Sequence, residues 1–233
     1  MDPLGHDVAL IVGAGDGLSA SIARRFAREG MRIALAARNT EKLSALCKEI
    51  DGGAFSCDAA SPYQVAHLFE NVEREISAPD VVVYNPSARA RGALIDLDPA
   101  DVERSLAVTA FGGFLVAQQA IRRMLQKQHG AVLFTGASAS IKGYPRSAPF
   151  AMGKFALRGL AQSMARELSP QGIHVAHFVI DGSIRNPGRS EPQDKPDSML
   201  DPDAIAESYL HAVRQPRSAW TWEIELRPWV ESF

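Results

Sequence analysis

The sequence predicts an α/β fold, with a doubly wound parallel sheet of about seven strands and helices on both faces of that sheet. Two observations support this prediction. Short segments that are apolar at nearly every position recur along the chain, as expected for strands covered on both faces. Amphipathic segments with helix-start signals separate them, and this alternation is typical of a parallel sheet with right-handed crossovers. We therefore interpret residues 1–233 as one domain.

Strands are expected where the apolar segments occur, at residues 8–12, 32–36, 54–57, 81–84, 131–134 and 174–180, with an aromatic strand at 219–226. Helix starts are expected where a serine or aspartate closely precedes a proline, because the side chain can cap the first turn and proline suits its first position. Such pairs are Ser61-Pro62, Asp98-Pro99, Ser147 with Pro149, and Asp201-Pro202. Further helices are expected at 148–168 and 203–213.

Residues 187–202 form the clearest change in composition along the chain. The segment PGRSEPQDKPDSMLDP has four prolines, mixed charges and almost no apolar side chains. A loop of this length in a compact domain is usually a binding lid or a disordered segment. We interpret it as a substrate lid within the domain.

The composition argues against several classes of protein. Apolar residues make up 46% and charged residues 22% of the chain, and the net charge of −2 argues against a nucleic-acid binder that needs a strong positive field. With only Cys47 and Cys57, neither a disulfide scaffold nor a metal site is expected. No apolar run approaches the roughly 18 residues of a membrane span, and the first residues do not resemble a signal peptide. We expect a cytoplasmic protein without a membrane or nucleic-acid partner.

A glycine-rich segment follows the first expected strand. Gly13, Gly15 and Gly17 precede an amphipathic stretch that begins near Leu18. Glycines allow a tight turn and let backbone N–H groups approach a diphosphate at a helix N-terminus. The spacing G-x-x-x-G-x-G is met by Gly13 and Gly17, with Ser19 as a small substitute for the third glycine. We interpret this glycine loop as a dinucleotide-binding loop rather than a purely structural turn.

Arg38 and Asn39 follow the second expected strand, where the residue type distinguishes binding of NAD from binding of NADP. A carboxylate there would bind the 2′-hydroxyl of NAD, whereas an arginine accommodates the 2′-phosphate of NADP. No acid occurs between Gly30 and Glu41, so Arg38 favours NADP over NAD, with a solvated surface arginine as the alternative. Asp16 places negative charge near the expected phosphates, and capping of the following helix is its alternative role.

Four further motifs follow the glycine loop along the chain. They are Cys57-Asp58-Ala59, Asn85-Pro86, Lys154 four residues after Phe150, and Asp181-Gly182-Ser183-Ile184. With these motifs the chain resembles the short-chain dehydrogenase/reductase family over nearly its whole length, which implies a Rossmann-type sheet. The resemblance also implies that the cofactor is contacted by Asp58, Ala59, Asn85, Pro86, Lys154, Gly182 and Ile184.

The resemblance implies a catalytic site that this sequence retains only in part. In the family a tyrosine exchanges a proton with the substrate oxygen, a lysine four residues later lowers the tyrosine pKa, and a serine and an asparagine assist. Here the tyrosine position is Phe150, the serine position is Ala137 and the asparagine position is Thr109, so only Lys154 remains. Retention of this lysine supports cofactor binding without establishing catalysis.

Two nearby residues are candidates to replace the missing hydroxyl groups. Ser138 directly follows Ala137, and Tyr144 lies in a segment that borders the substrate in the family. A backbone-bonded serine and a packed loop aromatic are the simpler interpretations. Arg146 and Arg185 are candidates for binding an acidic substrate, although surface positions explain them more simply.

These observations leave three hypotheses open. The first is an atypical NADP(H)-dependent oxidoreductase that transfers hydride to or from a small carbonyl or alcohol substrate, with Lys154, Ser138 and Tyr144 as catalytic candidates. The alternative is a non-catalytic NADP(H)-binding homologue, such as a sensor or partner subunit. The third is a chain that binds no nucleotide. The resemblance also implies a homodimer or homotetramer.

Overall fold

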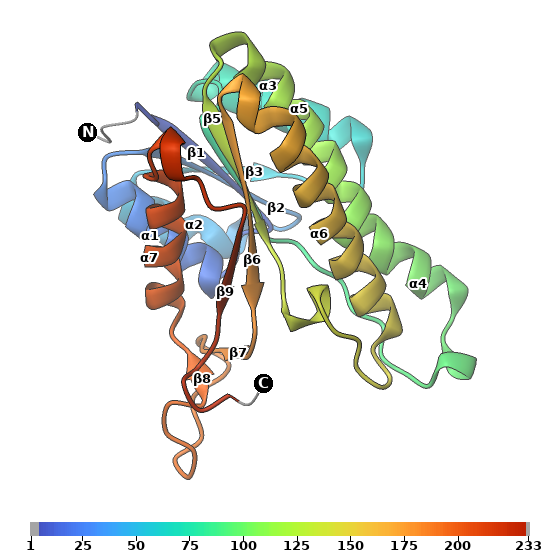
Figure 1. Ribbon diagram of the computed structural model, residues 1–233. Coiled ribbons are helices and arrows are strands. Elements are labelled where there is room, and N and C mark those ends of the chain that lie inside the picture. Colours follow the sequence, from blue (N-terminus) through green and yellow to red (C-terminus); the bar gives the residue numbers. More distant parts are fainter. Residues whose placement is uncertain (1–4, 232–233) are drawn as a thin grey trace.

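The computed structural model describes residues 5–231, in which seven strands form one sheet in the order β3-β2-β1-β4-β5-β6-β9 (Figure 1). All neighbouring strands in this sheet are parallel. The strands are β1 (Val8–Val12), β2 (Arg32–Ala37), β3 (Gly53–Ser56), β4 (Val81–Tyr84), β5 (Gly130–Thr135), β6 (Ile173–Ile180) and β9 (Glu223–Leu226). The predicted α/β fold with a doubly wound parallel sheet is confirmed.

Helices cover both faces of the sheet (Figure 1). The core on one face joins the strands to α1 (Leu18–Arg28), α2 (Ser44–Ile50) and α7 (Pro202–Val213). The core on the other face joins them to α3 (Pro62–Glu75), α5 (Gly112–Lys127) and α6 (Ala148–Leu168), and α4 (Pro99–Leu106) packs against α6. Central strands supply alternate residues to the two cores, which explains why they are apolar at nearly every position.

The helix caps at Ser61, Asp98 and Asp201 form as predicted, since each side-chain oxygen accepts a backbone N–H of the first turn. Two other capping expectations are wrong. Asp16 does not cap α1, because the N-cap position falls one residue later, at Gly17, and has no side-chain hydrogen bond. Ser147 precedes α6 without such a bond, because its φ of −137° and ψ of 24° depart from the extended conformation of the three capping residues.

The last strand is shorter than its aromatic sequence predicts. It begins at Glu223 rather than Ala219. Trp220 packs on His174 with ring centroids 4.8 Å apart, and its Nε1 donates to the backbone O of Gln215 at 3.0 Å. The tryptophan is therefore held by the preceding loop and by a histidine of β6, not by strand pairing.

The segment predicted as a lid, residues 187–202, contains regular structure at its C-terminal end. Its residues Met199–Leu200 form β8, which pairs with β7 (Ser183–Ile184), and α7 already begins at Pro202. The connecting loop projects beyond the end of the sheet (Figure 1). Within residues 5–231, no helix is long and apolar enough to span a membrane.

The position of β1 between β2 and β4 determines where a ligand can bind. The chain reverses its direction of travel across the sheet at this point. In open α/β sheets the carboxyl ends of the strands leave a crevice at such a reversal. The loops that follow β1 to β6 are therefore brought to one edge, although their sequence positions span most of the chain.

Candidate nucleotide and substrate crevice

Two cavities lie along the carboxyl edge of the sheet and share Asn85 and Ser87. The Lys154 cavity has a volume of about 290 Å³ and lies among α6 and the loops after β4, β5 and β6. The Arg38 cavity has a volume of about 340 Å³ and lies among the loops after β1, β2, β3 and β4. Because they share two lining residues, the cavities lie side by side along the sheet edge, and we refer to them together as the crevice.

Most residues predicted to bind a cofactor line this crevice. Of these predicted residues, the ones that line the Lys154 cavity are Gly17, Leu18, Asn85, Lys154, Gly182 and Ile184. The Arg38 cavity is lined by Gly13, Arg38, Asp58, Ala59, Asn85 and Pro86. Gly15, Asp16 and Asn39 line neither cavity. Asn39 instead accepts a hydrogen bond from the backbone N–H of Glu41 through Oδ1, at 2.9 Å.

The glycine loop is fixed against the end of β4. Gly13 has a φ of +80°, and a Cβ at this position would lie 2.7 Å from the backbone N of Pro86. Ser19 Oγ donates to the backbone O of Gly13 at 3.1 Å, and Asn85 Nδ2 donates to Ser19 Oγ at 2.6 Å. Ser19 is thus more than a small replacement for glycine, because its hydroxyl ties the loop to Asn85.

The N-terminus of α1 faces the Lys154 cavity through Gly17 and Leu18. No acidic side chain lies in the first turn of this helix. The unpaired backbone N–H groups and the helix dipole favour an anionic group at such a position. Asn186, to which no sequence motif points, lies close by: a Cβ at Gly17 would be 3.5 Å from its Cβ. This end of the crevice fits a diphosphate.

Three cationic side chains line the Arg38 cavity, and two of them, Arg38 and Lys42, follow β2. Lys42 Nζ would lie 4.0 Å from a Cβ at Gly15, so the lysine reaches back toward the glycine loop. Among the described residues that line this cavity, Asp58 is the one carboxylate, and its Oδ1 accepts the N–H of Ala60 at 3.0 Å. Two cations suit a phosphate group. The sequence signal for Lys42 is its position four residues after Arg38.

Lys154 extends from α6 into the cavity that bears its name and is only 3% exposed. Its Nζ donates to the backbone O of Thr135, at the end of β5, at 2.6 Å. Burial, and to a smaller extent the charge of Arg89, lowers the pKa of Lys154 to about 7. A group with such a pKa can give or take a proton near neutral pH, as general acid–base chemistry requires.

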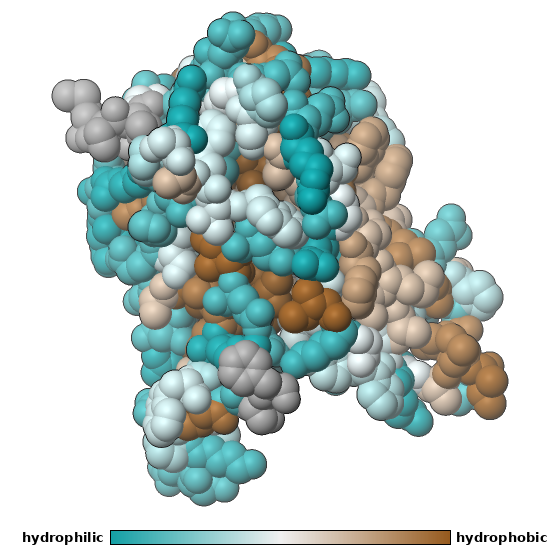
Figure 2. All heavy atoms as spheres, viewed as in Figure 1, coloured by the Kyte–Doolittle hydropathy of each residue, from teal (hydrophilic) through white to brown (hydrophobic). Residues whose placement is uncertain are grey.

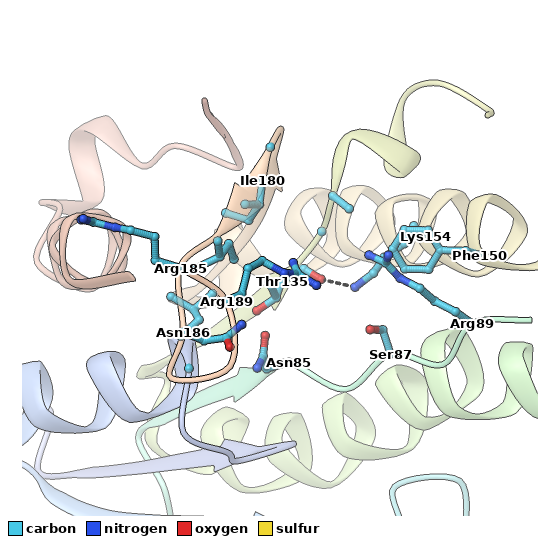
Figure 3. A pocket seen from close by; sticks show the side chains of 16 residues that line it. Asn85, Ser87, Arg89, Thr135, Phe150, Lys154, Ile180, Arg185, Asn186 and Arg189 are labelled. Atoms are coloured by element: carbon cyan, nitrogen blue, oxygen red, sulfur yellow. Dashed lines mark hydrogen bonds between the residues drawn. The ribbon is translucent and has the colours of Figure 1, made fainter. Parts of the chain in front are cut away.

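Arg89 covers the ring of Phe150, one helical turn before Lys154. The guanidinium Cζ lies 4.0 Å from the ring centroid, and Lys154 Nζ lies 5.9 Å from the same centroid. Figure 3 shows the two cationic groups approaching the ring from different elements, the loop after β4 and helix α6. No motif in the sequence points to Arg89, and its only signal is a position just beyond a strand end.

A group of hydrogen-bonded polar side chains lies behind the site, where Glu223 of β9 contacts both Arg158 and His177. Arg158 forms two hydrogen bonds to the carboxylate, at 2.6 and 2.8 Å, and His177 Nδ1 lies 3.2 Å from Glu223 Oε2. Burial lowers the pKa of His177 to about 4, although Glu223 opposes this shift. Within residues 5–231 its Nε2 has no hydrogen-bond partner, and a Cβ at Gly136 would lie 2.4 Å from it. His177 is therefore a neutral, tightly packed support beneath the end of β5.

Comparison with known proteins identifies the family. The sequence matches the short chain dehydrogenase family over residues 7–189, which is more than half of the chain. The protein belongs to the short chain dehydrogenase family.

Solved structures and known relatives agree with this assignment. A short-chain dehydrogenase from Rhodopseudomonas palustris is 35% identical, has a TM-score of 0.82, and the match covers 96% of this chain and 99% of that one. A metagenomic short-chain oxidoreductase in complex with NADP is 26% identical, has a TM-score of 0.83, and covers 98% and 99%. The 3-oxoacyl-[acyl-carrier-protein] reductase of Homo sapiens is 28% identical over 170 residues, 72% of each chain.

In this member of the family, the side chains assigned to the family's tyrosine and serine positions both line the Lys154 cavity. They are Phe150 and Ala137, and neither carries a hydroxyl group. Thr109, at the assigned asparagine position, lies in the π-helical turn 107–111 and is completely buried. Its Oγ1 accepts the backbone N–H of Ala88 at 3.1 Å. The threonine thus holds the loop after β4 rather than lining the cavity.

Ser138 and Tyr144 are not among the residues that line the Lys154 cavity. Ser138 begins a short 3₁₀ turn, and Ser140 at the end of that turn accepts the N–H of Ala137 through Oγ at 3.1 Å. Tyr144 is 43% exposed, and Lys142 Nζ lies 5.9 Å from its ring centroid. The structure therefore brings Lys154 together with Arg89 rather than with either predicted hydroxyl.

Proposed function

We propose that this member of the family is an NADP(H)-dependent oxidoreductase with an atypical active site, which transfers hydride to or from a small carbonyl or alcohol substrate. The observation that carries the proposal is the position of Lys154, buried in a cavity that adjoins the one lined by Arg38. We further propose that the chain acts as one domain and that the segment 187–202 borders the substrate, since Arg189 lines the Lys154 cavity.

NADP is the preferred cofactor in this proposal. The N-terminus of α1 at Gly17 suits the diphosphate, and Arg38 with Lys42 suits the 2′-phosphate. The turn at Gly13 fits as well, because its positive φ and close approach to Pro86 exclude a larger residue. The relative that was solved with NADP supports the same choice.

A bound reduced nicotinamide would supply the hydride that forms the new C–H bond at the carbonyl carbon. The carbonyl oxygen then needs a proton, which Phe150 cannot donate. Lys154 Nζ is held in place by Thr135 O, and its pKa near 7 lets the ammonium form release a proton around neutral pH. In this mechanism Lys154 protonates the oxygen, directly or through a water molecule, and regains its proton from solvent.

Binding of NADP(H) without turnover is the second candidate function. It is favoured by one observation, the cation–π contact that places Arg89 over the ring of Phe150. Phe150, at the family's tyrosine position, thereby packs against the Arg89 guanidinium and has no proton to donate. A protein of this kind would respond to the cofactor as a sensor or partner subunit.

Separate measurements of cofactor binding and turnover test these proposals. We expect NADPH to raise the melting temperature more than NADH does, because a ligand of the native state stabilises it. The difference should shrink in the Arg38→Ala/Lys42→Ala variant. Absence of any shift with either cofactor would overturn both candidate functions and favour a chain that binds no nucleotide.

Turnover is then followed as NADPH oxidation with a panel of small carbonyl compounds. Activity of the native protein that is lost in Lys154→Met supports the oxidoreductase. Activity that appears only in Phe150→Tyr, or in Phe150→Tyr/Ala137→Ser, supports the non-catalytic binder.

We also propose that the chain assembles as a homodimer or homotetramer through α5 and α6. Four large apolar side chains on or beside these helices, Phe111, Phe114, Met152 and Phe155, are each at least 40% exposed. Apolar colours cover much of the α6 side of the molecule (Figure 2). A second copy of the chain would remove this apolar surface from water.

A further inference from the structure

Four cationic side chains line the Lys154 cavity, and three of them point into it from three different elements (Figure 3). Arg89 comes from the loop after β4, Lys154 from α6, and Arg189 from the loop that follows β7. No carboxylate occurs among the described residues that line the cavity. Positive charge is therefore concentrated around a space of about 290 Å³.

Two acidic side chains near this cavity are already paired with other cations. Arg185 also lines the cavity, but it forms an ion pair with Asp201. Asp181 is buried, and its Oδ2 lies 3.3 Å from both Lys142 Nζ and Arg227 Nη2. These two carboxylates are thus paired with other cations and do not neutralise Arg89 or Arg189, which line the cavity.

The surroundings of Arg89 orient it and leave its charge unbalanced. Burial and the charges of Arg91 and Arg189 lower its pKa, and no acid is among the groups that act on it. Its guanidinium lies 4.0 Å from the ring centroid of Phe150. A guanidinium held against a ring keeps its N–H donors at its edge, where they can form paired hydrogen bonds to an oxyanion. An anion bound there would also relieve the repulsion between the cations.

We propose that the substrate carries an oxyanion, either a carboxylate or a phosphate, and that Arg89 binds this group while Lys154 serves the reacting carbonyl. The inference rests on the proposed function, because it describes the substrate of the same cavity. In the reduction a bound reduced nicotinamide would supply the hydride and would itself be oxidised. Lys154 Nζ would supply the proton, so that C=O would become CH–OH while the oxyanion stays unchanged.

Arg189 is assigned to the cofactor side of the cavity. It exchanges two backbone hydrogen bonds with Asn186, at 2.9 and 3.1 Å. Asn186 in turn lies against Gly17 at the N-terminus of α1, the expected diphosphate position. Arg89 approaches from the opposite side of the cavity, with Phe150 and Lys154 (Figure 3). The substrate oxyanion is therefore expected at Arg89.

Phe150 acquires a role as a positioning residue in this arrangement, because its ring supports the guanidinium. Phe150→Leu removes the aromatic face and should raise KM for an anionic substrate with little change in kcat. Phe150→Tyr keeps the face and should retain the preference for an anion. A residue that only fills space would not distinguish anionic from neutral substrates.

Matched pairs of carbonyl compounds test the substrate class. The pairs are 4-oxopentanoate with its methyl ester, and dihydroxyacetone phosphate with dihydroxyacetone. For whichever anion is used, Arg89→Met should lower kcat/KM by about 10- to 100-fold, the range expected for loss of a charge-assisted hydrogen-bond pair. The neutral partner should change less than about 2-fold. Arg91→Met removes a charge from the same exposed segment and is the control, with little effect on either compound.

Calorimetric titration of the same anions, with and without NADPH, separates the two proposals. If the anions bind in an Arg89-dependent way but NADPH does not bind, the anion site is supported and the proposed function is overturned. Reduction that is equal for acid and ester, and unchanged in Arg89→Met, would overturn the anion site and leave the oxidoreductase standing. If all four compounds are inert as substrates, equal affinity of both anions for native and Arg89→Met protein overturns the inference.

Discussion

At the scale of single residues, Lys154 sets the pH dependence of the proposed reaction. Its pKa of about 7 means that the ammonium form disappears as the pH rises through neutrality. We expect kcat/KM for carbonyl reduction to fall about tenfold per pH unit above pH 7, because the amine has no proton to donate. Steady-state rates from pH 5.5 to 9 measure this. A profile that stays flat across this range contradicts a proton-donor role for Lys154.

His177 makes the fold sensitive to acid. Its pKa is about 4 in the folded protein and near 6.5 in an unfolded chain, so the unfolded state binds more protons between these values. The free energy of unfolding should therefore fall as the pH drops from about 6.5 to 4, by up to about 3 kcal/mol. Urea unfolding at pH 7, 5.5 and 4.5 measures it. His177→Gln should flatten this dependence, and an equally steep loss in that variant would assign it to other groups.

The sequence was sufficient to find those site residues that act through a local motif. Gly13 is indicated by the spacing of the glycine loop, and Lys154 by its place four residues after Phe150 in a five-residue motif. Arg89 and Lys42 carry no such motif. They matter because the sheet brings the loops after β4 and β2 to the same edge as α6 and the glycine loop. Their role depends on distances across the fold, which spacing along the chain does not contain.

At the scale of elements, helix α6 has two glycines with opposite requirements. A Cβ at Gly153 would lie 2.9 Å from Cβ of Thr109, a buried and β-branched side chain that has no room to turn away. We expect Gly153→Ala to lower the free energy of unfolding by about 1–3 kcal/mol. At Gly159 a Cβ would meet no atom within 4 Å. Gly159→Ala should stabilise the helix by about 0.5–1 kcal/mol.

Chemical denaturation of the two glycine variants beside the native protein gives both values. Each change adds the same methyl group to the same helix, so the pair separates crowding from helix propensity. Equal stabilisation by both substitutions would show that the π-helical turn around Thr109 moves aside readily.

The interior strands were predicted well, because burial on both faces imposes a continuous apolar sequence on them. The ends of the sheet were predicted less well. The aromatic stretch at 219–222 resembles a strand, yet Trp220 packs on His174 of β6 and its Nε1 donates to the backbone O of Gln215. The short pair β7–β8 was missed because two-residue strands have no periodicity to detect.

At the scale of the whole molecule, the apolar surface of α5 and α6 predicts self-association. Replacing both Phe114 and Phe155 with glutamate would place charges in the proposed interface, so we expect the variant to sediment as a monomer while the native chain does not. Tyr63→Glu is the control, because Tyr63 is 70% exposed on α3, outside this surface. A native protein that remains monomeric in sedimentation at tens of micromolar contradicts the assembly.

The end of β6 has a consequence for how the molecule opens. The backbone N–H of Asp181 donates to Leu226 O at 2.8 Å, a bond that a proline at this position could not make. The carboxylate of Asp181 meanwhile contacts Lys142 and Arg227. An edge strand normally frays and exchanges its amide hydrogens early. Here β9 is fastened to the loop beside the substrate cavity, so the two segments should open and close as one cooperative unit.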